Sequence, residues 1–164
     1  MSRNYPFLDR LARGPILADG AMGTQLYARG ARLSDCFDAA NLNNADLVQA
    51  IHLDYLRAGA ELIETNSFGA NAIKLARADV LRPNDLADRV CKINRQAVRI
   101  ARYARDIAGS TAFIAGSIGP LGQALAPLGE IGEAQARDAF LAQAEALLEG
   151  GIDLFILETF ADLN

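Results

Sequence analysis

Four short apolar runs recur along the chain, and each ends in polar residues or glycine. The runs cover residues 15–18, 61–64, 111–115 and 153–157. Segments of this length that are largely apolar and bounded by Gly, Asp or Asn are typical of buried strands. The pattern therefore predicts four strands, the first of which ends at Asp19-Gly20.

The segments between these runs carry apolar residues at helical spacing. Four apolar residues between positions 47 and 55 fall on one helical face, and Gly59 ends that helix. Its start is predicted from Asn43 and Asp46, which stand three residues apart as in a capping box. Further helices are predicted over 22–28, 70–78, 86–104 with Asn84 as its N-cap, and 140–148.

Strands and helices alternate in this prediction, and the alternation indicates the fold class. Apolar strands separated by amphipathic helices form parallel sheets that are covered by helices. Two segments also echo each other, GAELIET at 59–65 and GIDLFILET at 151–159, as repeated strand units would. We therefore predict one α/β unit built on a parallel sheet.

Polar groups stand at the end of every predicted strand. They are Asp19-Gly20, Glu64-Thr65-Asn66, Gly116-Ser117 and Glu158-Thr159. The carboxyl ends of parallel strands lie at one edge of a sheet, where α/β proteins bind their ligands. Three carboxylates meeting there could hold a substrate ammonium, bind a divalent cation or act as acid and base. Each could instead cap a helix or pair with an arginine.

Composition narrows the class of partner. Apolar residues make up 51% and charged residues 22% of the 164 residues, and the net charge of −4 comes from interspersed acids and bases. No basic block or basic and aromatic stripe indicates nucleic-acid binding. No apolar run approaches the roughly 20 residues of a membrane span, and no signal peptide is recognised. We expect a cytoplasmic protein with a small-molecule partner.

Residue types that bind metals or act as nucleophiles are sparse. Cys36 and Cys91 lie far apart and form no Cys-x-x-Cys or Cys/His motif, so two reduced and mostly packed thiols are expected. A metal pair or a disulfide is the alternative. His52, the one histidine, falls inside a predicted helix, which favours a structural role over catalysis.

Four motifs resemble those of homocysteine S-methyltransferase domains. Residues 19–24 read DGAMGT, similar to the family's DGxMGT, and residues 64–71 read ETNSFGAN, similar to ETNTFxAN with Ser67 in place of the usual Thr. GSIGP at 116–120 resembles the family's GxxGP turn, and LETF at 157–160 matches its LETF. The motif order and spacing are most similar to bacterial forms, including those fused to a methylenetetrahydrofolate reductase.

The resemblance implies a (β/α)₈ barrel in which a zinc ion binds the homocysteine thiolate as the nucleophile toward a methyl donor. The donor would be a methylated amino acid, a betaine, or methyltetrahydrofolate acting through a corrinoid. Carried over from the family motifs, Asp19, Gly20 and Glu158 would hold the amino acid end of homocysteine, with Asn66 also at the mouth. The resemblance assigns no catalytic residue and no metal ligand in this chain.

The family's three zinc cysteines lie in later strands, in a single-Cys motif and a Cys-Cys pair that have no match here. Residues 1–164 would thus form the first four strands of a TIM barrel, an incomplete domain that supplies substrate-binding residues. We expect no methyltransferase activity from it alone, and association through open sheet edges. A fragment of another TIM-barrel enzyme, such as a Mg²⁺-dependent lyase or aldolase, and a non-catalytic remnant are the alternatives.

Overall fold

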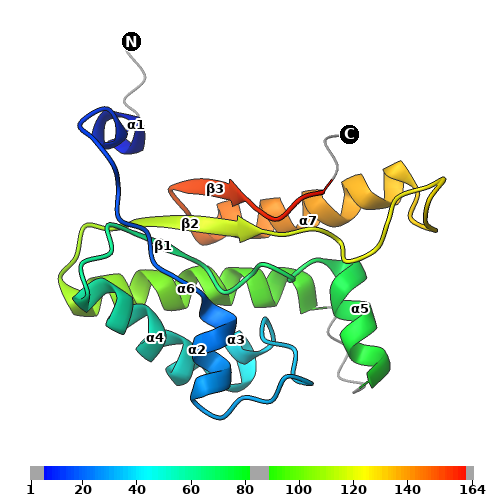
Figure 1. Ribbon diagram of the computed structural model, residues 1–164, viewed down its shortest axis with the longest axis horizontal. Coiled ribbons are helices and arrows are strands. Elements are labelled where there is room, and N and C mark those ends of the chain that lie inside the picture. The colour runs from blue at the N-terminus through cyan, green and yellow to red at the C-terminus, as the bar shows by residue number, and fades with distance from the viewer. Residues whose placement is uncertain (1–5, 82–88, 162–164) are drawn as a thin grey trace.

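A three-stranded parallel sheet forms the centre of the computed structural model, which describes residues 6–81 and 89–161 (Figure 1). The strands are β1 (Leu62–Glu64), β2 (Phe113–Ile118) and β3 (Leu154–Leu157), and they lie in the order β1-β2-β3. Strands that follow each other in the chain are therefore neighbours in the sheet. Parallel neighbours need a crossover connection, and helices provide it here.

Helices precede the sheet and connect its strands. They are α1 (Pro6–Leu11), α2 (Met22–Ala28), α3 (Ala40–Asn43), α4 (Ala45–Arg57), α5 (Ala72–Leu81), α6 (Val90–Ala108) and α7 (Glu133–Gly150). The long helices α6 and α7 run alongside the strands, and α4 packs against α6 and β1 (Figure 1). Within the described residues, no helix is long and apolar enough to cross a membrane.

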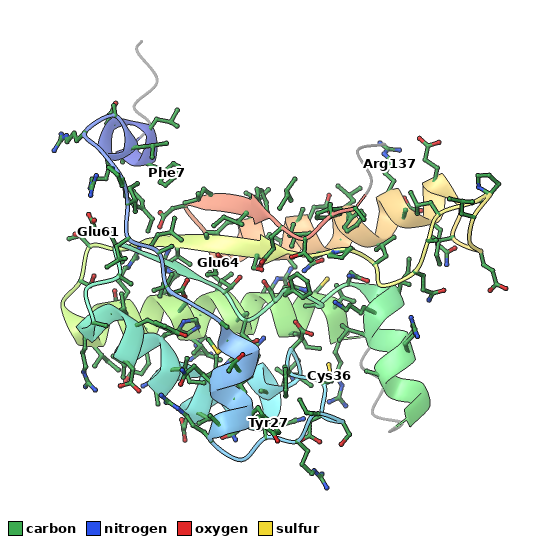
Figure 2. The ribbon with its side chains drawn as sticks, viewed as in Figure 1. Phe7, Tyr27, Cys36, Glu61, Glu64 and Arg137 are labelled. Carbon is green, nitrogen blue, oxygen red and sulfur yellow. The ribbon has the colours of Figure 1, made fainter. Side chains whose placement is uncertain are left out.

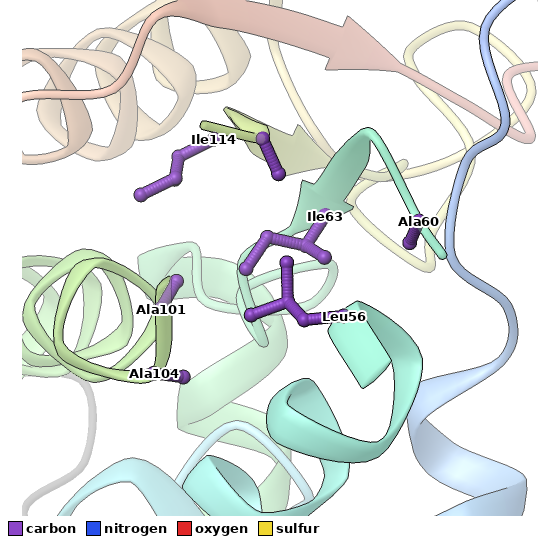
Figure 3. Close-up of a cluster of buried hydrophobic side chains, with 7 residues drawn as sticks. Leu56, Ala60, Ile63, Ala101, Ala104 and Ile114 are labelled. Carbon is purple, nitrogen blue, oxygen red and sulfur yellow. The ribbon is translucent and has the colours of Figure 1, made fainter. Parts of the chain in front are cut away.

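The core between the sheet and helices α4 and α6 uses large side chains from the strands and small ones from α6. Ile63 and Ile114 are fully buried and pack with Leu56 of α4 (Figure 3). The α6 side chains in the same cluster are Ala101 and Ala104, both fully buried. Alanines there let α6 approach the sheet closely, and burying this apolar surface stabilises the parallel arrangement.

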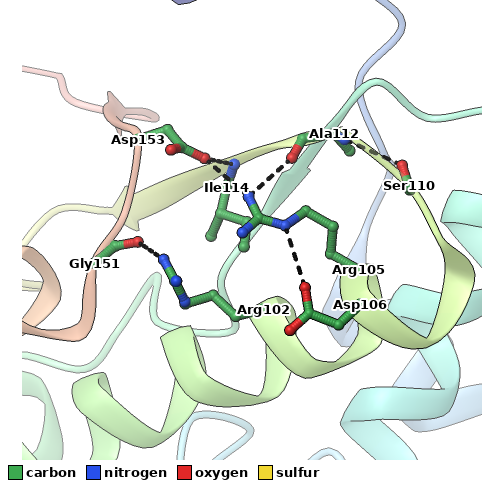
Figure 4. A network of polar contacts seen from close by, with 8 residues as sticks. All are labelled: Arg102, Arg105, Asp106, Ser110, Ala112, Ile114, Gly151 and Asp153. Atoms are coloured by element: carbon green, nitrogen blue, oxygen red, sulfur yellow. Dashed lines mark hydrogen bonds and ion pairs between the residues drawn. The ribbon is translucent and has the colours of Figure 1, made fainter.

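Polar contacts fix the amino ends of β2 and β3 to α6 (Figure 4). The Asp153 carboxylate accepts the Ile114 N–H at 2.8 Å and forms an ion pair with Arg105 of α6 at 3.4 Å. Arg102, one turn earlier on α6, donates to the Gly151 carbonyl at 2.8 Å. These contacts fix the position of β3 along the direction of β2. They therefore also fix where the carboxyl ends of the two strands lie relative to each other.

The predicted first strand is reduced to a single bridge. Ala18 pairs with Leu62 in parallel, and the Asp19 N–H donates to the Leu62 carbonyl at 2.9 Å. The segment thus follows β1, but the N–H groups that would extend the ladder are used elsewhere, since Ala60 donates to the Tyr55 carbonyl and Glu64 donates to the Asp19 side chain. The prediction of four strands is therefore not confirmed, because the described residues form three strands and this bridge beside them.

The third predicted strand ends later than expected. The sequence predicts that Gly116 and Ser117 follow the strand, whereas both lie inside β2. A Cβ at Gly116 would lie 2.7 Å from Ile152 Cδ1 and 3.2 Å from Leu147 Cδ1. The glycine is required by the close approach of α7 and the segment before β3, and not by a turn. The other two strands begin one residue later than predicted.

Several helix starts differ from the prediction, and the helix predicted over 70–78 begins at Ala72. Asn43 is the last residue of α3 and makes no capping contact with α4, so the capping-box prediction is wrong. The N-terminus of α4 begins directly after α3, where the Asn44 carbonyl accepts the Leu47 and Val48 N–H groups. The helix predicted over 140–148 begins earlier, since α7 already starts at Glu133. The predicted N-cap Asn84 lies outside the described residues.

Candidate functional site

The carboxyl ends of the strands border a cavity of about 680 Å³. It also extends along the start of α2, the segment 35–38 and the start of α5. Figure 2 shows Glu64 at the end of β1 and Cys36 in the loop that follows α2. All four residues predicted to bind substrate line this cavity, namely Asp19, Gly20, Asn66 and Glu158. Their role in binding stays a prediction, but the structure does bring them together.

The pleat of the sheet directs three polar side chains to the same face. Glu64 pairs with Ala115, which stands two residues before Ser117. Ser117 in turn pairs with Ile156, which stands two residues before Glu158. Alternate residues of a strand share a face, so Glu64, Ser117 and Glu158 lie on the face opposite to α4 and α6.

Asp19 is tied to the end of β1. Its Oδ2 accepts the Glu64 N–H at 3.0 Å, a contact between residues 45 positions apart in the chain. Burial raises the pKa of Asp19 to about 7, and the charge of Glu158 adds to this, while the hydrogen bond from Glu64 opposes it. Near neutral pH the Asp19 carboxyl is therefore close to the midpoint of its titration.

Glu64 has the same unusual titration. Burial raises its pKa to about 7, and the charge and hydrogen bonding of Glu158 act in the same direction. The Ser117 hydroxyl opposes the shift, and it also donates to Glu158 Oε1 at 2.5 Å. Three carboxyl groups thus share a partly desolvated space, and a cation entering it would replace protons and lower the cost of their charges.

Hydroxyl groups lock the ends of β1 and β2 together. The Ser117 N–H donates to Thr65 Oγ1 at 3.2 Å, and Ser67 Oγ donates to the Ser117 carbonyl at 2.8 Å. Thr65 Oγ1 and Ser67 Oγ are 2.7 Å apart. Because the Ser67 hydrogen is used on the carbonyl, Thr65 is the donor in this last contact. The three residues form a closed circuit at the mouth of the cavity.

Asn66 uses its amide to hold the neighbouring loop. Its Nδ2 donates to the Phe37 carbonyl at 2.8 Å and to Asn41 Oδ1 at 3.2 Å. Asn41 returns a bond to the Asn66 carbonyl at 2.7 Å. These contacts give Asn66 a structural task that the sequence did not indicate, beside its place in the cavity wall.

Buried amides on two helices hold the loop after β1 from behind. Gln143 of α7 donates to the Ser67 carbonyl at 2.6 Å, and Asn94 of α6 donates to the Ala70 carbonyl at 2.8 Å. Both side chains are fully buried. Sequence reasoning missed these residues, because a polar residue within a helix is ordinarily assigned to the solvent side.

The part of the cavity near α5 is lined by an acid, a lysine and an aromatic ring. Asp38 accepts the Gly69 N–H at 2.9 Å, and burial raises the pKa of its carboxyl, with Lys74 opposing the shift. The Lys74 Nζ lies 4.2 Å from the centre of the Phe68 ring, within reach of a cation–π interaction. A side chain at Gly69 would meet Asp38 Oδ2 at 2.7 Å, so glycine is required for this packing.

Neither cysteine belongs to a metal site in the part of the chain that the structure describes. No group of three His, Cys, Asp or Glu side chains there is placed to hold a metal ion. Cys36 and Cys91 form no disulfide, and Cys91 is exposed on α6 rather than packed as expected. His52 is fully buried in α4, away from the cavity wall, in agreement with a structural role.

The fold and the cavity define an α/β protein with an acidic cavity at the carboxyl edge of a parallel sheet. Comparison with known proteins is more specific, since residues 16–164 match the family model for homocysteine S-methyltransferase. The chain belongs to the homocysteine S-methyltransferase family.

Several relatives are similar over nearly the whole chain. The methionine synthase of Mycobacterium tuberculosis is 37% identical over 165 residues, which cover 95% of this chain and 13% of that protein. The homocysteine S-methyltransferase of Escherichia coli is 36% identical over 179 residues, covering 100% of this chain and 56% of the relative. The chain therefore spans about half the length of the second relative and a small part of the first.

Solved structures show the same relationship. The metallated form of the homocysteine methyltransferase MmuM from Escherichia coli superposes with a TM-score of 0.74 at 32% identity. The match covers 93% of this chain and 57% of that structure. The apo form of the same enzyme gives a TM-score of 0.63. The fold described here is thus the fold of part of a homocysteine methyltransferase.

Proposed function

We propose that this chain is the half of a homocysteine S-methyltransferase that binds the amino acid end of homocysteine. The whole enzyme would move a methyl group to the homocysteine thiol and so form methionine. The observation that carries the proposal is the convergence of Asp19, Glu64 and Glu158 on one cavity in a chain of this family. Carboxylates that lack a cation are suited to an ammonium group.

The residues have separate tasks in this proposal. Asp19 and Glu158 accept hydrogen bonds from the substrate ammonium, and their partial burial strengthens these contacts. Gly20 lines the cavity without a side chain, so its backbone can approach the substrate carboxylate. Asn66 completes the wall. Binding the polar end in this way orients the thiol away from the acids.

Zinc belongs to the proposal only through the resemblance. The described residues do not offer a set of ligands for it, so they give no support to a metal centre in this half. We expect the zinc ligands, and the strands that would complete an eight-stranded barrel, in the rest of the enzyme. The residues of this chain hold the amino acid and take part in no step at the metal.

The remaining partners follow from the same reasoning. Homocysteine and a methyl donor are the proposed small molecules, and the donor is undetermined. A fused reductase domain is proposed from the resemblance alone, and a cytoplasmic location is proposed from the composition of the sequence. A Mg²⁺-dependent lyase or aldolase is less favoured, because the family match points to transfer onto homocysteine. A non-catalytic remnant would conserve the fold without activity.

The test compares this chain with the protein encoded when the reading frame is followed past Asn164. We expect the longer protein to contain a lone Cys and then a Cys-Cys pair, and to form methionine from homocysteine and a methyl donor. The 164-residue chain should form none. Glu158→Gln should reduce homocysteine affinity in the longer protein about tenfold or more, because it removes a charged acceptor.

The matched control is Glu149→Gln, which alters an exposed glutamate on α7 that pairs with Arg95. It should leave homocysteine affinity unchanged. Methylation of homocysteine by the 164-residue chain alone would contradict the division of labour. Equal losses from both substitutions would contradict the assignment of the site.

A further inference from the structure

We propose that Lys74 binds the carboxylate of the methyl donor, so that the enzyme selects small donors that carry both a cationic methylated group and a carboxylate. The proposal rests on the proposed function, because it places homocysteine at the strand ends and the donor beside it. Lys74 lies in the part of the cavity near α5, which the amino acid end of homocysteine does not occupy.

The charges of the cavity wall single out this lysine. Lys74 is the cation among the described residues that line the cavity. A ligand carboxylate is repelled by the acids around it, and a lysine ammonium can neutralise it. The other charged side chains of the described wall are all acids, namely Asp19, Asp35, Asp38, Glu64 and Glu158.

The Lys74 side chain is held between two glycines and an aromatic ring. A Cβ at Gly69 would lie 3.1 Å from Lys74 Cδ, and a Cβ at Gly122 would lie 3.7 Å from Lys74 Cε. The Nζ lies 4.2 Å from the centre of the Phe68 ring. That ring is fixed in turn, since it packs on Gly119 where no Cβ would fit. These contacts fix the ammonium without supplying a hydrogen-bond acceptor.

The ammonium of Lys74 has three donors, and within residues 6–81 and 89–161 it makes no hydrogen bond and no ion pair. Asp38 is close enough for the two charges to interact, but its oxygens have other contacts. Asp38 Oδ1 accepts the Gly69 N–H at 2.9 Å, and Asp38 Oδ2 lies 4.0 Å from Cys36 Sγ. A fixed ammonium without an acceptor at the wall of a cavity is suited to binding an anion.

Lys74 is too far from the acids at the strand ends to share one amino acid with them. It lies in the first turn of α5, which stands beyond the carboxyl ends of the strands (Figure 1). It is not among the groups whose charge shifts the pKa of Asp19 or Glu64. The ammonium and carboxylate of an amino acid are attached to one carbon, so homocysteine held at Asp19 does not reach Lys74. The cavity of about 680 Å³ has room for a second small molecule.

The donor carboxylate is unchanged by the reaction, and this defines the contribution of Lys74. Transfer forms a bond from the methyl carbon to the homocysteine sulfur and breaks its bond to the donor's sulfur or nitrogen, which keeps the electron pair and becomes neutral. The thiol proton leaves to solvent. A contact that is equal in the bound donor and in the transition state strengthens binding without speeding the bound complex. Lys74 therefore determines the KM for the donor and not kcat.

The first experiment measures methyl transfer by the longer protein that continues past Asn164. Its donors are S-methylmethionine and glycine betaine, each compared with its carboxamide, which lacks the carboxylate. We expect Lys74→Met to raise the KM for an accepted carboxylate donor about tenfold, with kcat and the KM for homocysteine unchanged. The KM for the matching carboxamide should not change. Lys74→Arg, which keeps the charge, should restore most of the donor affinity.

The control is Lys92→Met, which removes the other lysine of the sequence, exposed on α6 and outside the cavity wall. It should leave every KM unchanged. An equal rise in KM for a donor and its carboxamide, or no rise for either, would overturn the proposal. Transfer from a methylated corrinoid, with neither small donor accepted, would overturn it as well.

The second experiment measures donor binding by calorimetry, apart from transfer. Wild type should bind S-methylmethionine or glycine betaine, and Lys74→Met should bind it about tenfold more weakly. Donor binding that depends on Lys74, with no methionine formed, would overturn the proposed function and leave the anion site standing. Methionine formation, with equal donor affinity in wild type and Lys74→Met, would overturn the anion site and leave the proposed function standing.

Discussion

His52 lies fully buried in α4, and neither ring nitrogen has a hydrogen-bond partner among the described residues. Burial lowers the pKa of His52 to about 4, because the charged ring would lose its hydration. The histidine therefore stays neutral in the folded protein at physiological pH. Between pH 6.5 and 4 the histidine binds a proton in the unfolded chain and not in the folded protein. The free energy of unfolding therefore depends on pH in this range.

We predict that His52→Leu flattens part of the pH dependence of stability. Unfolded chains take up the proton near pH 6.5, and the folded protein near pH 4, so stability is complete above 6.5 and is lost as the pH falls toward 4. The loss amounts to about 3 kcal/mol over this window. Urea unfolding of both proteins at pH 7 and pH 4.5 measures it. Parallel losses in both would contradict the prediction.

Glu64 should respond to pH in the opposite direction. Its pKa is raised from 4.5 to about 7, so the folded protein holds the proton more tightly and its stability falls as pH rises through 7. Glu64→Gln should therefore stabilise the protein at pH 8, by about 1 kcal/mol because the carboxyl is partly open to solvent. Thermal melting at pH 6 and 8 tests this.

The control for Glu64 is the same substitution at Glu61. That side chain pairs with Arg10 at 2.7 Å, so Glu61→Gln removes an ion pair and should give no gain in stability at either pH. A gain at Glu61 equal to that at Glu64 would indicate a general effect of net charge and not burial of the carboxyl.

Elements were predictable where one periodicity dominates. The helix α2 has its predicted bounds, and β1 and β3 agree within one residue, because apolar runs and turn residues mark their ends. The wrong predictions concern residues whose role depends on contacts with residues far away in the sequence. Gly116 makes room for Leu147 and Ile152, and such a need depends on packing between elements far apart in the chain.

The buried amide of Gln143 offers a test of coupling between elements. We predict that Gln143→Leu destabilises the protein by about 1–3 kcal/mol, because the Ser67 carbonyl loses a buried donor. The loop after β1 should open more often, and hydrogen exchange should quicken at Ala70, whose N–H shares the same carbonyl. Gln135→Leu, exposed at the start of the same helix, is the control. Equal exchange in both variants would show that the loop does not depend on α7.

The candidate site was predictable as a set of strand ends, since parallel strands place all their carboxyl ends at one edge. The motifs supplied Asp19, Gly20, Asn66 and Glu158, and the fold brings them to one cavity. The hydrogen bond from Ser117 to Glu158 could not be predicted in the same way. The serine hydroxyl meets Glu158 across a strand pair, and only the register shows that the two side chains share a face.

At the scale of the whole molecule, an apolar surface remains uncovered between α7 and β3. It includes Phe140, Leu141, Phe155, Leu157 and Phe160, and two of these rings, Phe140 and Phe160, lie 5.7 Å apart. Leu157 is 69% exposed although it belongs to a strand. Contiguous apolar patches beside an open strand edge promote association.

We therefore predict that the 164-residue chain associates in solution and that Leu157→Lys reduces this association. A lysine on the edge strand adds charge where copies would meet. Sedimentation velocity over a concentration series measures the change. Leu128→Lys is the control, because Leu128 is 92% exposed in the loop before α7 and lies outside the patch. A monomeric wild-type chain, or equal effects of both lysines, would contradict the prediction.

The parallel register also governs how quickly this molecule can form. Leu62 meets Phe113 and Ala115 meets Leu154, so each strand pair joins positions roughly fifty and forty residues apart. Such closures must await the intervening helices, because the entropy of closing long loops is lost before any pairing is gained. Helix α6 takes part in both strand pairings. Its small side chains pack against β1 and β2, and its arginines hold the segment before β3. We therefore expect the formation of α6 to limit how fast the sheet assembles.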